Sequence, residues 1–362
     1  MGRRSSRLLF VAALALVVIP VSPQSGVNQT AASLPECATD CSVQVGCDPI
    51  SSCLCDSGIA NALTACITTA CSPADAVEAK KSQAETCDYP VRDLADTGIA
   101  VCWALFTVAI LFSIFRVVSR SKVWGGAGYW WDDWMLLICL LPTIGITVAG
   151  YLAYQNGLGK DYWEVGIPGI ETSLKYFFIG QPLYIAVVFG TKISLVLLYL
   201  RIFLTDARAL RVICWIVVSA LGMCLVAFEF ATIFQCIPIR YNWTKFDGGM
   251  GHCTDRQAQV YAVAGVNILF DILVIFMPLR HILKLGISPM KKAGICSVFL
   301  VGVVVIACSC VRLHYLVRYG SGDNITYNYT YIAIWSLIEV HLSIVCVCMP
   351  ATAGLAYRTW KF

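Results

Sequence analysis

Charged residues are scarce in this sequence. Of 362 residues, 13% are charged and 58% are hydrophobic, whereas soluble domains carry about 25% charged residues. The net charge is only +4, and the basic residues lie in short connecting segments rather than in one patch, which gives no indication of nucleic-acid binding. The composition predicts an integral membrane protein.

Enzyme motifs are absent as well. The sequence contains no P-loop, no H-E-x-x-H, no G-x-S-x-G and no evident nucleophile–base pair. The last apolar segment, residues 331–357, has no lysine, so a retinal Schiff base of the opsin kind has no usual place to form. We therefore expect neither an enzyme nor a retinal protein.

Seven apolar segments are long enough to cross a bilayer, which takes about 20 helical residues. They cover approximately residues 98–118, 133–154, 174–204, 210–234, 258–281, 294–317 and 331–357. Residues 1–25 are instead typical of a signal peptide, because a basic start precedes an apolar core, Leu8–Ile19, that is too short to span. An uncleaved anchor is the alternative. The predicted fold is all-α, with a seven-helix membrane bundle over residues 98–361.

The third segment, Tyr176–Phe203, is expected to be interior. Lys192 lies deep inside it, and a lysine at mid-membrane costs roughly 3 kcal/mol on insertion scales. That cost is normally met by turning the ammonium toward other helices or a wet cavity. Snorkelling is the alternative, although Arg201, at the end of the segment, is about 13 Å away along a helix.

Few other charges lie inside the predicted bundle. The intramembrane polar set is Lys192, Glu229, Asp271, Arg312 and Glu339, with His314 and His341 beside them. Matched depths predict that Lys192 meets Asp271 and that Arg312 meets Glu339, because pairing neutralises a costly charge. Such pairs fit either a static latch or a ligand pocket or switch.

Two aspartates, Asp132 and Asp133, open the second helix within the sequence WWDDW. Acidic groups favour a helix N-terminus through the dipole and by capping, which explains them without a functional role.

Residues 34–88 form a separate cysteine-rich module with no histidine. An even number of cysteines after a signal peptide predicts disulfides in an oxidising compartment, and a zinc site is the weaker alternative at these spacings. The eight cysteines are Cys37, Cys41, Cys47, Cys53, Cys55, Cys66, Cys71 and Cys87. Cys236 and Cys253 share one loop and are expected to pair, while nine further cysteines lie in apolar helices as small hydrophobes.

Two signals predict the orientation. The connections on one side of the bundle are richer in basic residues, which by the positive-inside bias makes that side cytoplasmic. The four N-glycosylation sequons all fall on the opposite side, together with the cysteine-rich module. These sequons are at Asn28, Asn242, Asn324 and Asn328. An extracellular N-terminus and a cytoplasmic C-terminus follow.

The cysteine pattern PEC-ATD-C, then C, then CLC, then C-x4-C, then C resembles the CFEM module of fungal extracellular membrane proteins. The resemblance implies a helical basket with the disulfides Cys37–Cys71, Cys41–Cys66, Cys47–Cys53 and Cys55–Cys87. It also implies haem as a cofactor, with Asp48 as the axial iron ligand. Asp48 follows Cys47 directly, whereas the family's ligand lies nearer the next cysteine, so a turn residue before Pro49 is the alternative.

Residues 98–361 resemble the fungal rhodopsin-type seven-helix domain. The matching pieces are WWDDW, GLGKDYW, TKISLVLLYLRIF, CIPIRYNW, FDILVIFMPL and WSLIEVHLSIVCVCMPA. Together the two resemblances imply a plasma-membrane sensor of extracellular or host-surface cues, coupled to a heterotrimeric G protein that docks around Arg116–Lys122, Arg201–Arg211 and Arg280–Lys292. Its partners would be membrane lipid and an unknown extracellular ligand. The alternatives are haem or iron acquisition, and adhesion by a module that the bundle merely anchors.

Overall fold

The computed structural model describes residues 34–48, 51–202, 208–244, 250–278, 289–319 and 324–361. The predictions for the signal peptide and for Asn28 lie outside these residues, as does the connection that contains Arg280 and Lys284.

A small helical module stands at the N-terminal end of the described chain. It contains α2 (Glu36–Gln44), η1 (Ser52–Cys55), α3 (Ser57–Ala70) and α4 (Pro73–Thr86). Side chains start two of the helices: Asp56 accepts from the Gly58 amide at 2.8 Å, and Ser72 accepts from the Asp75 amide at 3.2 Å. The module contains the four expected disulfides, namely Cys37–Cys71, Cys41–Cys66, Cys47–Cys53 and Cys55–Cys87. Its core is small, as expected for a domain that depends on cross-links.

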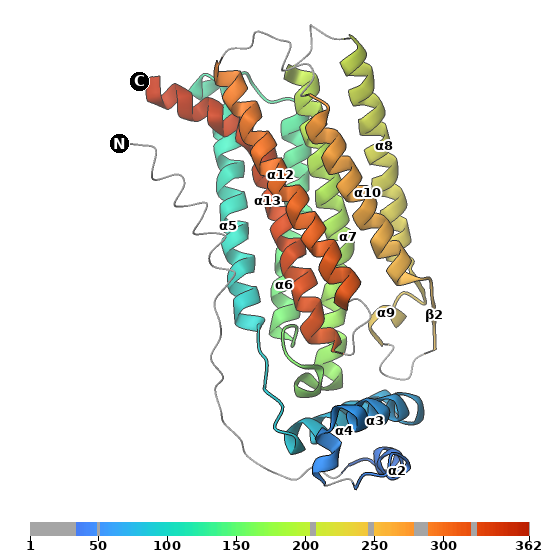
Figure 1. Cartoon of the computed structure of the whole chain (residues 1–362). Coiled ribbons are helices and arrows are strands. Elements are labelled where there is room, and N and C mark those ends of the chain that lie inside the picture. Colours follow the sequence, from blue (N-terminus) through green and yellow to red (C-terminus); the bar gives the residue numbers. More distant parts are fainter. Residues whose placement is uncertain are drawn as a thin grey trace.

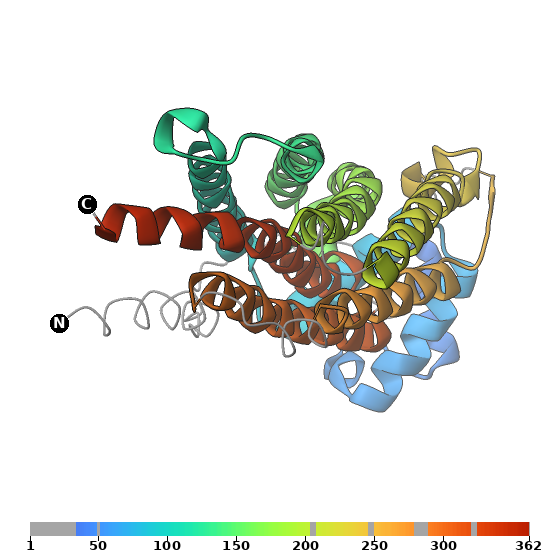
Figure 2. The same ribbon diagram turned by 90° about the horizontal axis from the view of Figure 1, so that it is seen from above.

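Seven helices of the described chain are long and apolar enough to cross a membrane, as predicted. They are α5 (Ala95–Arg120), α6 (Trp131–Gln155), α7 (Tyr162–Ile202), α8 (Arg208–Ile233), α10 (Arg256–Phe276), α12 (Pro289–Tyr319) and α13 (Ile325–Lys361). They run side by side as one bundle (Figure 1), seen from above in Figure 2. A short 3₁₀ helix, η2 (Lys122–Trp124), lies between α5 and α6.

Helix α7 is the central element of the bundle, as its sequence predicts. Of its most apolar 18-residue window, 78% is buried, against 22% for α5 and for α8. Among the spans found in the described residues, α13 is the other one with a mostly buried window, at 67%. The α7 segment includes a kink at Gly166, whose φ of 72° lies in the left-handed region that glycine adopts readily. The helix therefore begins earlier than predicted, in a short turn before the span itself.

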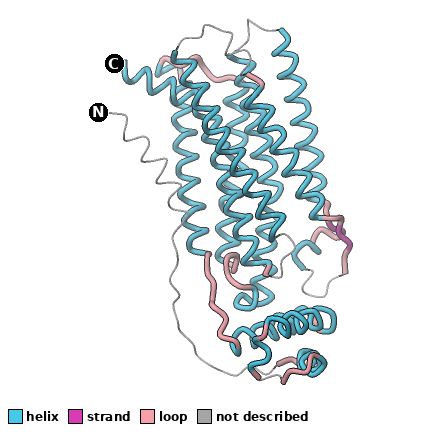
Figure 3. The backbone as a smooth tube through the Cα atoms, viewed as in Figure 1, coloured by secondary structure: helices cyan, strands magenta, loops and turns pink. Residues whose placement is uncertain are grey.

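A disulfide-linked loop covers one end of α8 and α10. The strands β1 (Cys236–Ile237) and β2 (His252–Cys253) pair antiparallel. The expected disulfide joins Cys236 to Cys253, and a single turn of helix, α9 (Tyr241–Thr244), lies between the strands. The tube in Figure 3 shows this loop at the same end of the bundle as the N-terminal module.

The module is attached to the bundle through a short linker. The Leu94 amide donates to the Gly159 carbonyl at 3.0 Å, and the Arg92 amide donates to Asp161 Oδ2 at 3.2 Å. Asp161 is fully buried and its Oδ1 also accepts from the Asn324 amide group at 2.5 Å. The linker, the start of α7 and the start of α13 thus meet at one carboxylate. Figure 1 shows the module at the end of the bundle opposite to the C-terminus.

Candidate functional site

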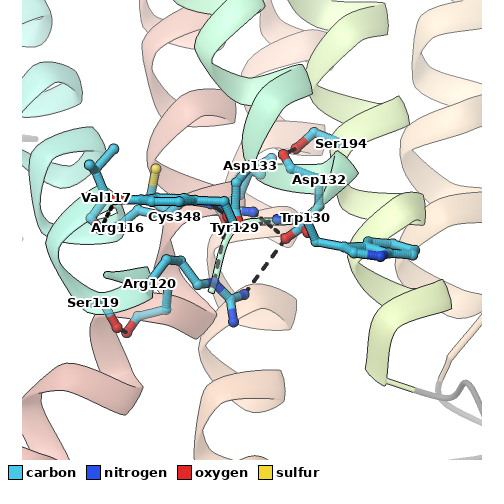
Figure 4. A network of polar contacts seen from close by, with 12 residues as sticks. Arg116, Val117, Ser119, Arg120, Tyr129, Trp130, Asp132, Asp133, Ser194 and Cys348 are labelled. Atoms are coloured by element: carbon cyan, nitrogen blue, oxygen red, sulfur yellow. Dashed lines mark hydrogen bonds and ion pairs between the residues drawn. The ribbon is translucent and has the colours of Figure 1, made fainter. Parts of the chain in front are cut away.

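Three arginines surround two aspartates near the end of the bundle that is remote from the module. Figure 4 shows four of these residues, Arg116, Arg120, Asp132 and Asp133. We call this group the inner cluster: Arg116, Arg120, Asp132, Asp133 and Arg201. Arg116 bridges both aspartates, with Nη2 2.5 Å from Asp132 Oδ2 and Nε 2.9 Å from Asp133 Oδ1. Arg201 does the same from the other side, at 3.2 and 3.0 Å. Arg120 adds longer ion pairs of 3.7 and 3.5 Å.

Backbone groups complete the inner cluster. Arg116 Nη1 donates to the Val347 carbonyl of α13, and Arg201 Nη2 donates to the Gly128 carbonyl at 2.7 Å. Ser194 of α7 donates to the Asp132 carbonyl at 2.7 Å. The cluster therefore joins α5, α6, α7 and α13. Such saturation is what a buried ion group needs, because each charge left unpaired in a low-dielectric interior is strongly unfavourable.

The sequence interpretation of Asp132 and Asp133 was incomplete. Asp133 does cap the helix, since its Oδ2 accepts from the Trp130 amide at 3.2 Å. Both carboxylates are nevertheless buried and bind arginines from two other helices. The signal was present in the sequence: two arginines four residues apart end one helix, and two aspartates begin the next one.

A second polar group, the central chain, crosses the middle of the bundle. The predicted pair is confirmed here: Lys192 Nζ lies 3.0 Å from Asp271 Oδ1. Lys192 also donates to Asn267 Oδ1 at 2.6 Å, and Asn267 Nδ2 donates to Glu339 Oε1 at 2.6 Å. The other predicted pair is confirmed as well, with Arg312 Nε 2.9 Å from Glu339 Oε2. The two pairs are thus one continuous chain over α7, α10, α12 and α13.

Sequence reasoning missed the neutral members of this chain. Asn267 joins the two ion pairs, and Ser309 donates to Glu339 Oε1 at 2.6 Å. Both are fully buried. An asparagine or serine in an apolar helix carries no charge, so the cost argument that singled out the lysine and the acids does not identify it.

Three other predicted residues stand apart from the central chain. Glu229 is half-buried on the span α8 and joins neither predicted ion pair, so its role as an intramembrane polar residue stays a prediction. His314 is exposed beside Tyr315. His341 is buried, with its ring nitrogens 3.2 Å from the Thr147 hydroxyl and 2.7 Å from the Leu337 carbonyl. It therefore joins α6 to α13 at a separate point.

A cavity of about 210 Å³ lies between the central chain and the disulfide-linked loop. Its walls come from α6, α7, α8, α10, α12 and α13 and are mostly apolar or aromatic, including Phe177, Tyr329 and Leu316. Arg312 and Tyr184 reach it from the central chain, and the guanidinium carbon of Arg312 stacks 4.5 Å from the Tyr184 ring centre. Among the described residues that line it, only Arg256 and Arg312 are charged.

The sequence model of the family described as the Fungal rhodopsin domain matches residues 115–358. The chain belongs to the fungal rhodopsin-domain family. That range contains every helix of the central chain and all of the inner cluster, so both groups lie within the family domain of this fungal rhodopsin-domain protein.

Three relatives of this fungal rhodopsin-domain protein show what the chain is similar to. A SAT4 family membrane protein of Emericella nidulans is 31% identical over 203 residues, which is 55% of this chain and 50% of that protein. Wortmanamides biosynthesis cluster protein C of Talaromyces wortmannii is 25% identical over 252 residues, 68% of this chain and 67% of the relative. Receptor GIN3 of Arthrobotrys oligospora is 24% identical over 263 residues, 71% of this chain and 62% of the relative. The matched part thus spans half of the first relative's length. No solved structure matches the chain.

The N-terminal module gives haem little support. Asp48 is exposed, and its carbonyl accepts from both the amide and the hydroxyl of Ser51 at 3.0 Å, which is a turn. No group of three or more His, Cys, Asp or Glu side chains in the described part of the chain is arranged to hold a metal. These bonds involve the backbone carbonyl of Asp48 and not its carboxylate, so its role as an axial haem ligand and the turn interpretation both stay predictions.

Three of the predicted sequons lie among the described residues. Asn242 is buried, and its amide group donates to the Ile239 carbonyl at 2.9 Å. The Asn324 amide group donates to Asp161, as described above. Neither amide is presented for a glycan in the folded chain. Asn328 is half-buried on the first turn of α13 and has no such bond among the described side-chain contacts, so it is the best placed of the three.

Proposed function

We propose that this protein is a plasma-membrane receptor whose ligand binds in the cavity and whose response is relayed through the central chain. The observation that carries the proposal is the position of Arg312. It lines the cavity and is paired with Glu339, which Asn267 connects to Lys192. A ligand that moves Arg312 therefore perturbs hydrogen bonds on four helices.

The two central helices offer a route from the cavity to the inner cluster. Helix α7 carries both Lys192 of the central chain and Ser194, which bonds to Asp132 of the inner cluster. Helix α13 carries both Glu339 and the Val347 carbonyl that Arg116 binds. A shift of either helix changes both groups, which supports coupling between two sites through packed elements.

The partner that we propose at the inner end is a heterotrimeric G protein. In the state described, Arg116 is 1% exposed and Arg120 16%, so these guanidiniums are held inside the cluster rather than offered to a partner. Opening of the inner cluster would present them. The name of one relative, Receptor GIN3, supports a receptor role for this chain as well. The N-terminal module would present the cue on the extracellular side.

The proposal is tested with the full chain in phospholipid nanodiscs and a fungal heterotrimeric G protein. Fractions of host-surface extracts are screened for stimulated nucleotide exchange, with the protein and with a variant lacking residues 34–88. Asn267→Ala interrupts the central chain but leaves both ion pairs in place, so we expect it to fold and to lose the response. Asn156→Ala is the matched control, because that amide bonds only to Leu152 of its own helix. A full response from Asn267→Ala, or none from the unmodified chain with any fraction, contradicts the proposal.

The proposed orientation has its own test. A variant retaining only the Asn328 sequon is expected to gain one glycan when it is made in secretory membranes, because that end of α13 would face the lumen. An otherwise identical variant with a sequon in the connection between α5 and α6 is expected to gain none. Glycosylation of the second variant and not the first would reverse the topology.

A further inference from the structure

We infer that the cavity takes a small amphipathic molecule with an anionic group, a carboxylate being the simplest, bound to Arg312. This inference rests on the proposed function, since it names the ligand class of the same site. It is drawn from the charges that line the cavity, from one unused donor and from the shape and lining of the space.

The charge of the lining is one-sided. Arg256 and Arg312 line the cavity, and no aspartate or glutamate is among the described residues that do so. Glu339, which pairs with Arg312, is not among the described residues that line the cavity and already serves three partners, Arg312, Asn267 and Ser309. A cationic ligand would meet two guanidinium groups, whereas an anion would meet complementary charge.

Arg312 has a donor with nothing to bind. Its side chain is 4% exposed and its Nη2 forms no hydrogen bond with any described residue. The nearby Tyr184 hydroxyl is also buried and without a hydrogen-bond partner among those residues. A buried donor without an acceptor is unfavourable, so a ligand that supplies the acceptor recovers this loss. Carboxylates fit arginine with two parallel hydrogen bonds.

The rest of the cavity wall indicates the size and polarity of the remainder of the ligand. Phe177, Tyr329 and Leu316 provide apolar surface around the space. Several polar amides on the wall are engaged with neighbours, because Gln259 donates to Thr232 at 3.0 Å and Gln235 to Gln181 at 3.4 Å, whereas Gln257 is exposed. A cavity of about 150 Å³ holds a benzene ring, so the 210 Å³ available here suits one or two rings with a short acid side chain.

The test uses a pair of probes that differ only in charge, naphthaleneacetate and naphthaleneacetamide. The full chain in phosphatidylcholine nanodiscs is titrated with each, and binding is followed by naphthalene fluorescence. We expect the acid to bind at least about tenfold more tightly than the amide, which corresponds to about 1.4 kcal/mol. Equal affinity for the two probes overturns the inference, and so does binding of neither.

Variants locate the site. Arg312→Gln combined with Glu339→Gln removes the pair without leaving a lone buried charge, and we expect it to lose the preference for the acid. Arg318→Gln is the matched control: it removes the same charge from the same helix at an exposed position that does not line the cavity. Tyr184→Phe tests the hydroxyl without a change of charge. An acid preference that survives the paired variant contradicts the assignment to Arg312.

A further arm identifies the source of the acid. Oleate, added at the same concentration, supplies a carboxylate from the membrane. If oleate displaces naphthaleneacetate and this displacement requires Arg312, the inference is supported and the source of the acid is a lipid. Absence of this competition by oleate supports a water-borne acid.

Two outcomes distinguish this inference from the receptor proposal. If the acid binds but never stimulates nucleotide exchange, the receptor proposal fails and the site stands. If nucleotide exchange is stimulated only by neutral ligands and is unaffected by substitution of Arg312, the receptor proposal stands and this inference fails.

Discussion

The inner cluster and the central chain both hold arginine and carboxylates inside the bundle, but their surroundings differ. In the inner cluster all four aspartate oxygens accept ion pairs, and Arg116 and Arg201 also donate to backbone carbonyls. Arg120 Nε, 3.5 Å from Asp133 Oδ1, is the one buried donor of this cluster without a hydrogen bond to a described residue. In the central chain Asp271 Oδ2 and Arg312 Nη2 make no hydrogen bond with any described residue. A space of about 30 Å³ lies beside Asp271 and the 210 Å³ cavity lies beside Arg312.

This difference distinguishes a brace, which holds the helices in one arrangement, from a relay, which passes a change from one site to another. A group in which every carboxylate oxygen is paired has few other favourable arrangements, because any movement breaks several charge-assisted bonds in a low-dielectric interior. A chain with unused donors and space beside them has alternatives of similar energy, which a ligand can select. We therefore expect substitutions in the inner cluster to affect stability most and those in the central chain to affect the response most.

The largest expected effect is that of Asp132→Ala. It leaves the buried Arg116 and the partly buried Arg120 and Arg201 around one aspartate, and removal of one partner from a buried ion group costs about 3–5 kcal/mol. Thermal unfolding of the purified protein in detergent, together with delivery to the cell surface, measures this loss. The control is Asp96→Ala, which removes an exposed aspartate from the first turn of α5. Equal stability of the two variants would show that the inner cluster is not a brace.

Next in size is the coupling between Lys192 and Asp271. Lys192→Ala leaves the aspartate without its cation and is expected to lower stability, while adding Asp271→Ala should recover part of that loss. Residues in direct contact couple by about 0.5–3 kcal/mol in a double-mutant cycle. The unfolding temperatures of the two single variants and the double variant give this coupling. Strictly additive effects would rule out the contact seen at 3.0 Å.

Tyr184→Phe is expected to leave stability almost unchanged. Its hydroxyl is buried without a hydrogen-bond partner in the described part of the chain, so removing it should be neutral or slightly stabilising. Thr147→Val is the matched contrast, because that hydroxyl bonds to the Thr143 carbonyl at 2.8 Å and meets His341. Its loss should cost about 1 kcal/mol. A larger loss for Tyr184→Phe than for Thr147→Val would mean that the central chain is as tightly satisfied as the inner cluster.

The smallest expected effect is that of Lys160→Ala at the outer end. Lys160 Nζ lies 3.5 Å from Asp93 Oδ2, but both side chains are 46% exposed. Exposed pairs contribute about 0–1 kcal/mol and are screened by salt. Unfolding curves at low and high salt should therefore differ little between this variant and the unmodified chain. A loss of stability as large as that of Asp132→Ala would show that burial is not what makes the inner cluster important for stability.

The sequence by itself determined the seven spans, the central place of Tyr176–Phe203 and the two ion pairs. These follow from local facts: runs of apolar residues match the bilayer thickness, and charges at equal depth in hydrocarbon need one another. The disulfides of the module were expected from the resemblance of its cysteine spacing.

Only the tertiary structure decided how those pairs are joined and what surrounds them. Asn267 connects the pairs because the rotation of α10 places its amide between Lys192 and Glu339. The position of a neutral residue in the sequence does not predict that rotation. Likewise Asp132 meets Arg201, 69 residues away, because α6 and α7 pack side by side. The cavity beside Arg312 arises in the same way, from six helices whose side chains leave a space that no single segment encodes.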